Sequence, residues 1–177
     1  IPPVARAVRA ANTLLPRPDG GWIADNPDVA AIVAALAENV VYPATMTILG
    51  AGGTAQAAVA AGAVSGVQEC SVLVRDLSRT HELRATADAM GVWLQVAELS
   101  PDARALSADL IVSTLPSGAA DPLADYVWRP EQTVFDVVYD PWPTALARAA
   151  VIGGAKVLSG ALMLLHQAAA QVELMTG

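Results

Sequence analysis

A glycine-rich turn between an apolar run and an alanine-rich run constrains the fold of this chain more than any other feature. Residues 45–49 are apolar or β-branched, residues 50–53 read Gly-Ala-Gly-Gly, and residues 54–63 are mainly alanine. This order predicts a strand, a tight turn and a helix. Short apolar runs continue to alternate with helical segments after the turn, a pattern that requires parallel strands with right-handed crossovers.

The alternation predicts an α/β fold with a doubly wound parallel sheet, a Rossmann-like dinucleotide-binding domain. Ahead of the glycine turn we expect helical character at 4–9, a short strand at 11–15, a turn at 16–21, an extended segment from Trp22 and a helix capped near Asn26. Further strands are expected at 45–49, 71–74, 92–96, 109–114, 134–139 and 156–158, and helices at 54–63, 79–90, 101–106, 144–152 and 160–175.

The glycines of the turn suit a nucleotide pyrophosphate. Gly50 permits the turn, Gly52 leaves no Cβ between the main chain and a phosphate, and the small residues Gly53 and Ala57 let the helix lie close to the sheet. The helix dipole adds positive potential beneath the anion. Because the pattern departs from the strict G-x-G-x-x-G, a plain structural turn is the alternative. The position after the first strand of the sheet favours nucleotide binding.

Arg75, Asp76 and Arg79 bear on which nucleotide is bound. They follow the second strand of the sheet, where the adenosine ribose of a dinucleotide meets the protein. Two arginines four residues apart suit a 2′-phosphate, whereas an acid suits a free 2′-hydroxyl. We therefore favour NADP, and NAD stays open because of Asp76, which either bonds the ribose or caps the next helix. The alternative is a surface cluster in which Arg79 pairs with Glu82.

Composition excludes several other functions. The 177 residues carry a formal net charge of -7, which argues against a nucleic-acid partner. No apolar run approaches the ~20 residues of a membrane span. Cys70 is the only cysteine, and it suits a reducing cytoplasm. His81 and His166 fall on expected helices, where we expect them to face solvent, and have no metal-ligand spacing. The chain begins at Ile1 without methionine or a signal-like segment, so we expect a fragment or a processed product.

Five motifs occur in order over nearly the whole chain. They are Ala11-Asn12-Thr13-Leu14, Asn26-Pro27-Asp28, Gly50-Ala51-Gly52-Gly53, Asp136-Val137-Val138-Tyr139-Asp140-Pro141 with Thr144 and Leu146, and Gly160-Ala161-Leu162-Met163-Leu164 with Gln167. Together they resemble the shikimate dehydrogenase family. The resemblance implies NADP-dependent, reversible reduction of 3-dehydroshikimate to shikimate in aromatic amino-acid biosynthesis, with a small-molecule substrate. Whether the protein is a monomer or a homodimer is left open by the family.

The resemblance also assigns roles to individual residues. It implies a catalytic pair of a lysine and an aspartate, in which Asp28 is the aspartate. Substrate contacts are implied at Asn12, Asp28, Tyr139 and Gln167. Cofactor contacts are expected at Gly50, Ala51, Gly52, Gly53, Thr54, Arg75, Asp76, Arg79, Thr114, Val137, Gly160 and Met163. Plainer explanations stay open: a helix-turn carboxylate for Asp28, a backbone partner for Asn12, core packing for Tyr139 and Met163, and a solvated helix residue for Gln167.

The chain departs from the family in ways that affect these expectations. Pro27 stands where the family has threonine, and Asp76 replaces the threonine of the family's Asn-Arg-Thr, which puts strict NADP preference in doubt. The serine pair and the catalytic lysine of the N-terminal substrate domain are not in this chain. Lys156, the single lysine, is expected at the edge of the sheet away from the ligands.

These departures set the expected domain division and two further functions. Residues 1–25 would be a remnant of the substrate domain, residues 26–160 the NADP-binding domain, and residues 161–177 a closing helix that returns toward the substrate domain. The isolated chain is expected to be inactive. The alternatives are an NAD-using quinate or shikimate dehydrogenase and a non-catalytic nucleotide-binding module.

Overall fold

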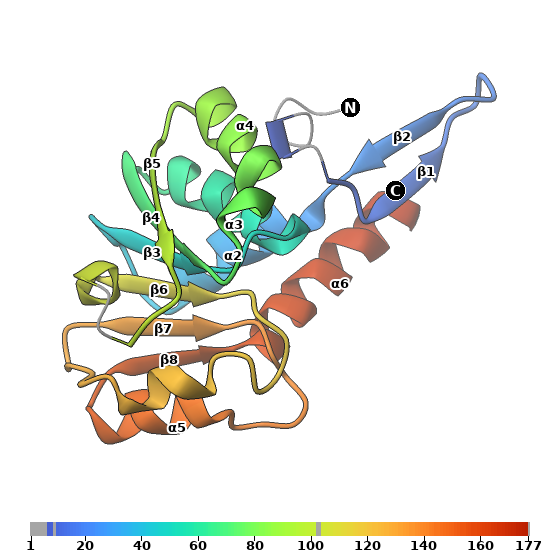
Figure 1. Ribbon diagram of the computed structural model, residues 1–177. Helices are drawn as coiled ribbons and strands as arrows, with labels where there is room; N and C mark the ends of the chain where they lie inside the picture. Colours follow the sequence, from blue (N-terminus) through green and yellow to red (C-terminus); the bar gives the residue numbers. More distant parts are fainter. Residues whose placement is uncertain (1–6, 9, 102–103, 177) are drawn as a thin grey trace.

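The computed structural model describes residues 7–8, 10–101 and 104–176 (Figure 1). Most of the helical segment expected at 4–9 lies outside these residues. Six parallel strands form one sheet in the order β5-β4-β3-β6-β7-β8. This order confirms the doubly wound, Rossmann-like fold, with the chain reversing direction across the sheet between β3 and β6. The strands are β3 (Met46–Leu49), β4 (Glu69–Val74), β5 (Trp93–Glu98), β6 (Leu110–Ser113), β7 (Thr133–Asp136) and β8 (Lys156–Ser159).

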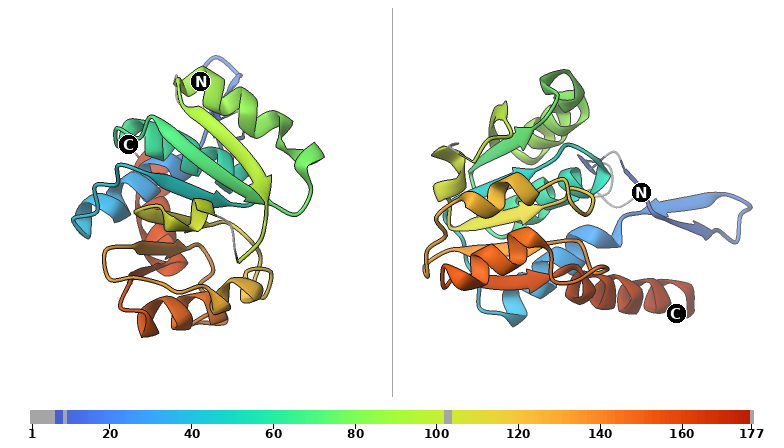
Figure 2. Two further views of the ribbon diagram at one scale, coloured as in Figure 1. Left: turned by 60° about the vertical axis from the view of Figure 1, so that its left-hand side comes forward. Right: turned by 60° about the horizontal axis from the view of Figure 1, so that its bottom comes forward.

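Helices cover both faces of the sheet, and each face has its own core (Figure 2). One core holds α2 (Pro27–Glu38), α3 (Gly53–Val64), α4 (His81–Met90) and the start of α6 (Gly160–Thr176). The other holds α5 (Ala145–Ile152) and the 3₁₀ turns η2 (Arg104–Ser107) and η3 (Asp121–Asp125). Successive strand residues alternate between the two cores, as Ile48 and Leu49 do. Because both faces are buried, the strands read as continuous apolar runs.

Side chains and prolines at the right positions explain where the helices begin. The side chain of Asn26 accepts a hydrogen bond from the Asp28 amide and so caps α2, and Pro27 occupies the first helical turn. Thr144 caps α5 in the same way, with its side chain accepting from the Ala147 amide. These caps fix where the chain leaves the strands and turns into helices, at the edge of the sheet where ligands are expected.

Several boundaries differ from the sequence expectation. The helix expected at 79–90 begins instead as a 3₁₀ turn, η1 (Leu77–Thr80), because the Asp76 side chain caps it. The strand expected at 134–139 stops at Asp136, whose carboxylate accepts a hydrogen bond from the Val138 amide at 3.2 Å and turns the chain. The short helix expected at 101–106 is a 3₁₀ turn in its described part, and η3 had no signal in the apolar periodicity.

A β-hairpin projects from the sheet domain beside α6 (Figure 1). It consists of β1 (Thr13–Pro16) and β2 (Trp22–Asp25), paired antiparallel with Thr13 opposite Asp25. The Gln171 amide of α6 donates a hydrogen bond of 3.0 Å to the Thr13 hydroxyl, which joins the hairpin to the last helix. The first and last described elements therefore lie together on one side of the domain.

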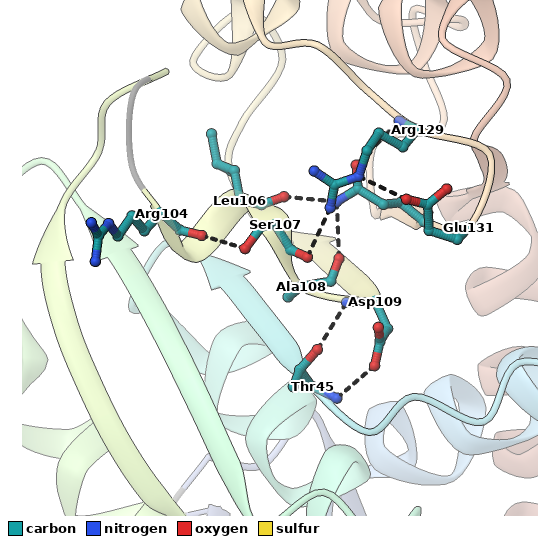
Figure 3. Close-up of polar contacts among 9 residues, drawn as sticks. Thr45, Arg104, Leu106, Ser107, Ala108, Asp109, Arg129 and Glu131 are labelled. Carbon is teal, nitrogen blue, oxygen red and sulfur yellow. Dashed lines mark hydrogen bonds and ion pairs between the residues drawn. The ribbon is translucent and has the colours of Figure 1, made fainter.

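Polar contacts tie the amino ends of the central strands together (Figure 3). The Asp109 carboxylate accepts from the Thr45 amide at 2.9 Å, and the Thr45 hydroxyl accepts from the Asp109 amide at 3.0 Å. Arg129 pairs with Glu131 at 2.8 Å and donates to the Ser107 carbonyl at 3.2 Å. The contacts made by these residues serve the fold and connect β3, β6 and β7 at the edge opposite the glycine turn.

Candidate functional site

A cavity of about 280 Å³ opens at the carboxyl ends of β3, β4 and β6. In an open α/β sheet this edge, at the point where the strand order reverses, is where ligands bind. Seven of its lining residues belong to the cofactor contacts expected from the sequence. The lining comprises Gly50, Ala51, Gly52, Val74, Arg75, Asp76, Arg79, Thr114, Leu115 and Pro116.

The glycine turn has the backbone geometry that a pyrophosphate requires. Gly50 has φ +106°, and a Cβ there would lie 2.7 Å from the Thr114 hydroxyl, which itself donates to the Leu49 carbonyl at 2.8 Å. Gly52 differs, because its φ of -82° is open to any residue and a Cβ there would meet nothing within 4 Å. A side chain at Gly52 would therefore project into free space at the cavity rather than into the protein.

The first turn of α3 supplies donors at the same place. The helix begins at Gly53, directly after Gly52, which has an extended backbone and no side-chain cap. The first amides of an α-helix have no partner within the helix and carry the positive end of its dipole. A phosphate beside Gly52 would accept from these amides without being held off by a side chain. The arrangement of Gly50 to Thr54 thus fits a dinucleotide pyrophosphate.

Arg75, Asp76 and Arg79 line the far side of the cavity, where all three are exposed. The Asp76 carboxylate oxygen Oδ1 accepts from the Ser78 hydroxyl at 2.6 Å and from the Ser78 amide at 2.9 Å. These bonds, the hydroxyl first, lower the pKa of Asp76 below its ordinary value, so this carboxylate is anionic at neutral pH. Of the two roles that the sequence left open for Asp76, the structure shows the helix cap.

Asn12 and Asp28 meet at the base of the hairpin. The Asn12 side-chain amide donates to Asp28 Oδ1 at 2.7 Å, and the Thr13 hydroxyl donates to Asn12 Oδ1 at 3.1 Å. Asn26 orients the segment, since its side chain accepts from the Asp28 amide at 3.0 Å and donates to the Ala10 carbonyl at 2.8 Å. Asn12 and Asp28, to which the resemblance assigned substrate contacts, are therefore hydrogen-bonded to each other.

Asp28 is buried in an environment that affects its charge. Its exposed fraction is 9%, and this burial raises its pKa above the ordinary value, while the hydrogen bond from Asn12 lowers it in part. A carboxylate held in this way gains from a cation placed against it, because the cation offsets the cost of burying the charge. The site can hold an ammonium group.

The remaining predicted residues lie around the end of β7 and the start of α6. Val137 is half-buried directly after β7, and a Cβ on Gly160 would overlap the Val137 carbonyl, so the two backbones are in contact. Met163 is only 6% exposed and packs into the core. Tyr139 is 58% exposed. In the part of the chain that the structure describes, neither Tyr139 nor Gln167 forms a direct hydrogen bond to Asn12 or Asp28.

The sequence did not single out Asp136 as a polar site. It is 1% exposed at the end of β7, where it accepts from the Thr144 hydroxyl at 2.7 Å. Burial raises its pKa, and the bonds from Thr144 and from the Val138 amide offset part of this effect. The carboxylate fixes the start of the segment that carries Val137 and Tyr139. The available signals were its place within an expected strand of apolar residues and its position at the start of one of the five family-like motifs.

Two expectations about cations met different outcomes. His166 was expected to face solvent and does so in part, since 27% of its side chain is exposed and its ring Nε2 lies 2.9 Å from a Glu38 carboxylate oxygen. Lys156 begins β8, at the amino edge of the sheet, where its ammonium donates to the Asn39 carbonyl at 2.8 Å.

Over residues 7–8, 10–101 and 104–176 there is no cluster of three or more His, Cys, Asp or Glu that could hold a metal, and no helix long and apolar enough to cross a bilayer.

No protein-family model matches the chain. A curated shikimate dehydrogenase (NADP(+)) of Caulobacter vibrioides is 34% identical over 188 residues, which cover 98% of this chain and 63% of the relative. A solved shikimate 5-dehydrogenase from Mycobacterium fortuitum is 40% identical with a TM-score of 0.83, over 98% of this chain and 64% of that one. Quinate dehydrogenase from Corynebacterium glutamicum in complex with NAD is 28% identical with a TM-score of 0.84, over 99% and 65%. The chain thus spans less than two thirds of the length of these proteins.

Proposed function

We propose that the chain belongs to the shikimate dehydrogenase family and that it is the nucleotide-binding part of an NADP-dependent enzyme that interconverts 3-dehydroshikimate and shikimate. The observation that carries this proposal is the cavity in which a glycine turn without side chains faces two arginines. An anionic dinucleotide needs both features, one for its pyrophosphate and one for a 2′-phosphate. The pathway this reaction serves is aromatic amino-acid biosynthesis.

The cavity fits NADP by its shape and its donors. The free space at Gly52 would admit a phosphate, and the first amides of α3 would donate to it. Arg75 and Arg79 would bind the 2′-phosphate with charge-assisted hydrogen bonds. Thr114, Val137, Gly160 and Met163 would line the rest of the cofactor site, Met163 through its small exposed part.

The side chains beside the cofactor would position the substrate and its proton. NADPH, when bound, supplies a hydride to the carbonyl carbon of the substrate. The carbonyl oxygen then gains a proton, which requires an acid within hydrogen-bond reach. Asp28 would hold a lysine ammonium that acts as this acid, while Asn12 would hold Asp28 and orient a ring hydroxyl. Tyr139 and Gln167 would complete the substrate contacts from the segment after β7 and from α6.

The lysine of this pair is not Lys156. That side chain is bonded to the Asn39 carbonyl at the amino edge of the sheet, whereas Asp28 lies at the base of the hairpin. We propose that the lysine comes from residues outside these 177, as the family pattern implies. The isolated chain is then expected to bind the nucleotide and to turn over substrate very slowly.

The same reasoning supports a division of the chain. We propose that residues 1–25 are a remnant of the substrate domain, that residues 26–160 form the nucleotide domain, and that residues 161–177 form a closing helix that returns toward the substrate domain. The hairpin and α6 lie together and expose large apolar side chains, Leu14 at 61% and Trp22 at 67% on the hairpin and Leu165 at 66% on the helix. Apolar surface of this kind suits contact with further protein. Sedimentation equilibrium of the purified protein separates a monomer from a homodimer, the two states that the family leaves open.

A second candidate is a quinate or shikimate dehydrogenase that uses NAD. Asp76 favours it, because an acid at the end of the second strand of the sheet can accept from a ribose 2′-hydroxyl and repels a 2′-phosphate. The similarity to a quinate dehydrogenase in complex with NAD also supports it. Titration of the protein with NADPH and with NADH, followed by their fluorescence, separates the two candidates by the ratio of the dissociation constants.

The reaction is tested with the complete protein of the reading frame. We expect oxidation of shikimate with reduction of NADP, followed by absorbance, and a loss of about 10²-fold or more in kcat for Asp28→Asn, in line with the contribution of proton transfer. Asp19→Asn in the hairpin turn is the matched control, since Asp19 pairs with the local residues Arg17 and Gly21. An enzyme that binds NADP but leaves shikimate and quinate unchanged would contradict the assignment. We place the activity in the cytoplasm, where the buried thiol of Cys70 would stay reduced.

A further inference from the structure

We propose that Ser78 is a specificity-determining residue, which favours NADP over NAD by holding the Asp76 carboxylate at the start of η1. The inference rests on the proposed nucleotide site and deepens it. Ser78 does not line the cavity itself, so it would act through Asp76, as a positioning residue. This role would explain how a site with an acid beside two arginines accepts a 2′-phosphate.

The contacts of the carboxylate are unequal. Oxygen Oδ1 accepts two hydrogen bonds, from the Ser78 hydroxyl at 2.6 Å and from the Ser78 amide at 2.9 Å. The other oxygen, Oδ2, accepts none in the described ranges of the chain. The carboxylate is therefore anchored on one side by residue 78 and open on the other.

The two bonds differ in what they depend on. The amide bond is a property of the backbone and of the cap on η1, and any residue at position 78 except proline would retain it. The hydroxyl bond depends on serine alone. It spreads the negative charge of Asp76 and restricts its side-chain rotation, so less charge faces a phosphate bound between Arg75 and Arg79.

Loss of the hydroxyl would affect the two nucleotides in opposite directions. A freer and less screened carboxylate repels the 2′-phosphate of NADP more strongly. The same carboxylate accepts more readily from the 2′-hydroxyl of NAD. If Ser78 had only a structural role, its loss would instead weaken the binding of both nucleotides equally, because both carry the pyrophosphate and the adenine.

The test is a double-mutant cycle on nucleotide binding. NADPH and NADH are titrated into the purified protein at fixed ionic strength, for wild type, Ser78→Ala, Asp76→Asn and the double variant. We expect Ser78→Ala to lower the ratio of the NADH to the NADPH dissociation constant by about threefold to tenfold, the effect of one ordinary hydrogen bond. Asp76→Asn, which keeps an acceptor for the cap, should raise this ratio.

The cycle separates the inference from the proposed function. In the Asp76→Asn background, Ser78→Ala should leave the ratio unchanged, because no charge remains to be held. Ser65→Ala, at the far end of α3, is the matched control, and circular dichroism of each variant checks that it is folded. An equal loss for both nucleotides, or a shift that persists without the Asp76 charge, would overturn the inference alone. A folded wild-type protein that binds neither nucleotide would overturn the proposed function and the inference with it.

Discussion

Gly52→Ala separates the fold from nucleotide binding. Gly52 has φ -82° and ψ -172°, which alanine adopts without strain, and a Cβ there would meet no protein atom within 4 Å. The methyl group would occupy the space in which we place the pyrophosphate. The substitution should therefore leave the protein folded while it removes the closest approach between the main chain and the cofactor.

The expected magnitudes follow from the two roles of Gly52. For stability, an alanine in an allowed conformation gains about 0.4–1 kcal/mol through the unfolded state, and its weaker capping of α3 costs a similar amount. The free energy of unfolding should thus change by less than about 1 kcal/mol. For binding, loss of one charge-assisted hydrogen bond costs about 1.5–3 kcal/mol, which raises the NADPH dissociation constant about 12-fold to 140-fold.

The assay is a fluorescence titration with NADPH alongside urea unfolding of the same preparation. Gly21→Ala in the hairpin turn is the matched control, since a Cβ there makes ordinary contacts with Arg17 and Asp19 and lies outside the cavity. Gly50→Ala should instead lower stability, because Gly50 has φ +106° and a Cβ would press on the Thr114 hydroxyl. A stable Gly52→Ala protein with the wild-type affinity for NADPH would refute the placement of the pyrophosphate.

Three further predictions concern stability, measured by urea unfolding. Gly160→Ala should lower the free energy of unfolding by about 1–3 kcal/mol, because its Cβ overlaps the Val137 carbonyl; wild-type stability would contradict this contact. Burial raises the pKa of Asp136, so the stability that its protonated form contributes is present below pH 3.8 and is lost as pH rises through the raised pKa. Between pH 4 and pH 7 the free energy of unfolding should therefore fall less for Asp136→Asn than for wild type. Asp109→Ala should lower the free energy of unfolding by about 1 kcal/mol at pH 7, mainly because the hydrogen bond from the Thr45 amide is lost. Because this bond lowers the pKa of Asp109, the difference between variant and wild type should fade as pH falls below 3.8 through the lowered pKa.

The sequence predicted the sheet well because most strands are short apolar runs that end at or close to a glycine or a charged residue. Strand positions and the parallel topology followed from this alternation alone. The assignment of side chains to faces did not, because Ile48 and Leu49 are both buried and the run carries no polar alternation. The 3₁₀ character of η2, where a short helix was expected, and the existence of η3 were also beyond the pattern, since a single turn has too few residues to show a period.

The candidate site divides in the same way. The glycine turn could be located because the run of glycines ends an apolar strand and Gly50 has a φ of +106° that favours glycine, and the cavity brings Gly50 and Gly52 together with Arg75. The role of Asp76 could not be decided, because capping and ribose binding require the same residue at the same place. The bond between Asn12 and Asp28 spans 16 residues, and no local pattern reports a contact that the hairpin and the cap of α2 create.

The hydrogen bond between Gln171 and Thr13 links the C-terminal part of α6 to the surroundings of Asp28. Thr13 donates in turn to Asn12, and Asn12 donates to Asp28, so a relay of three bonds runs from α6 to the buried carboxylate. A truncation that removed the last turns of α6 would loosen the amide that steadies Asp28, 143 positions earlier in the chain than Gln171. The C-terminal part of α6 therefore helps to position the carboxylate to which we assign a role in catalysis.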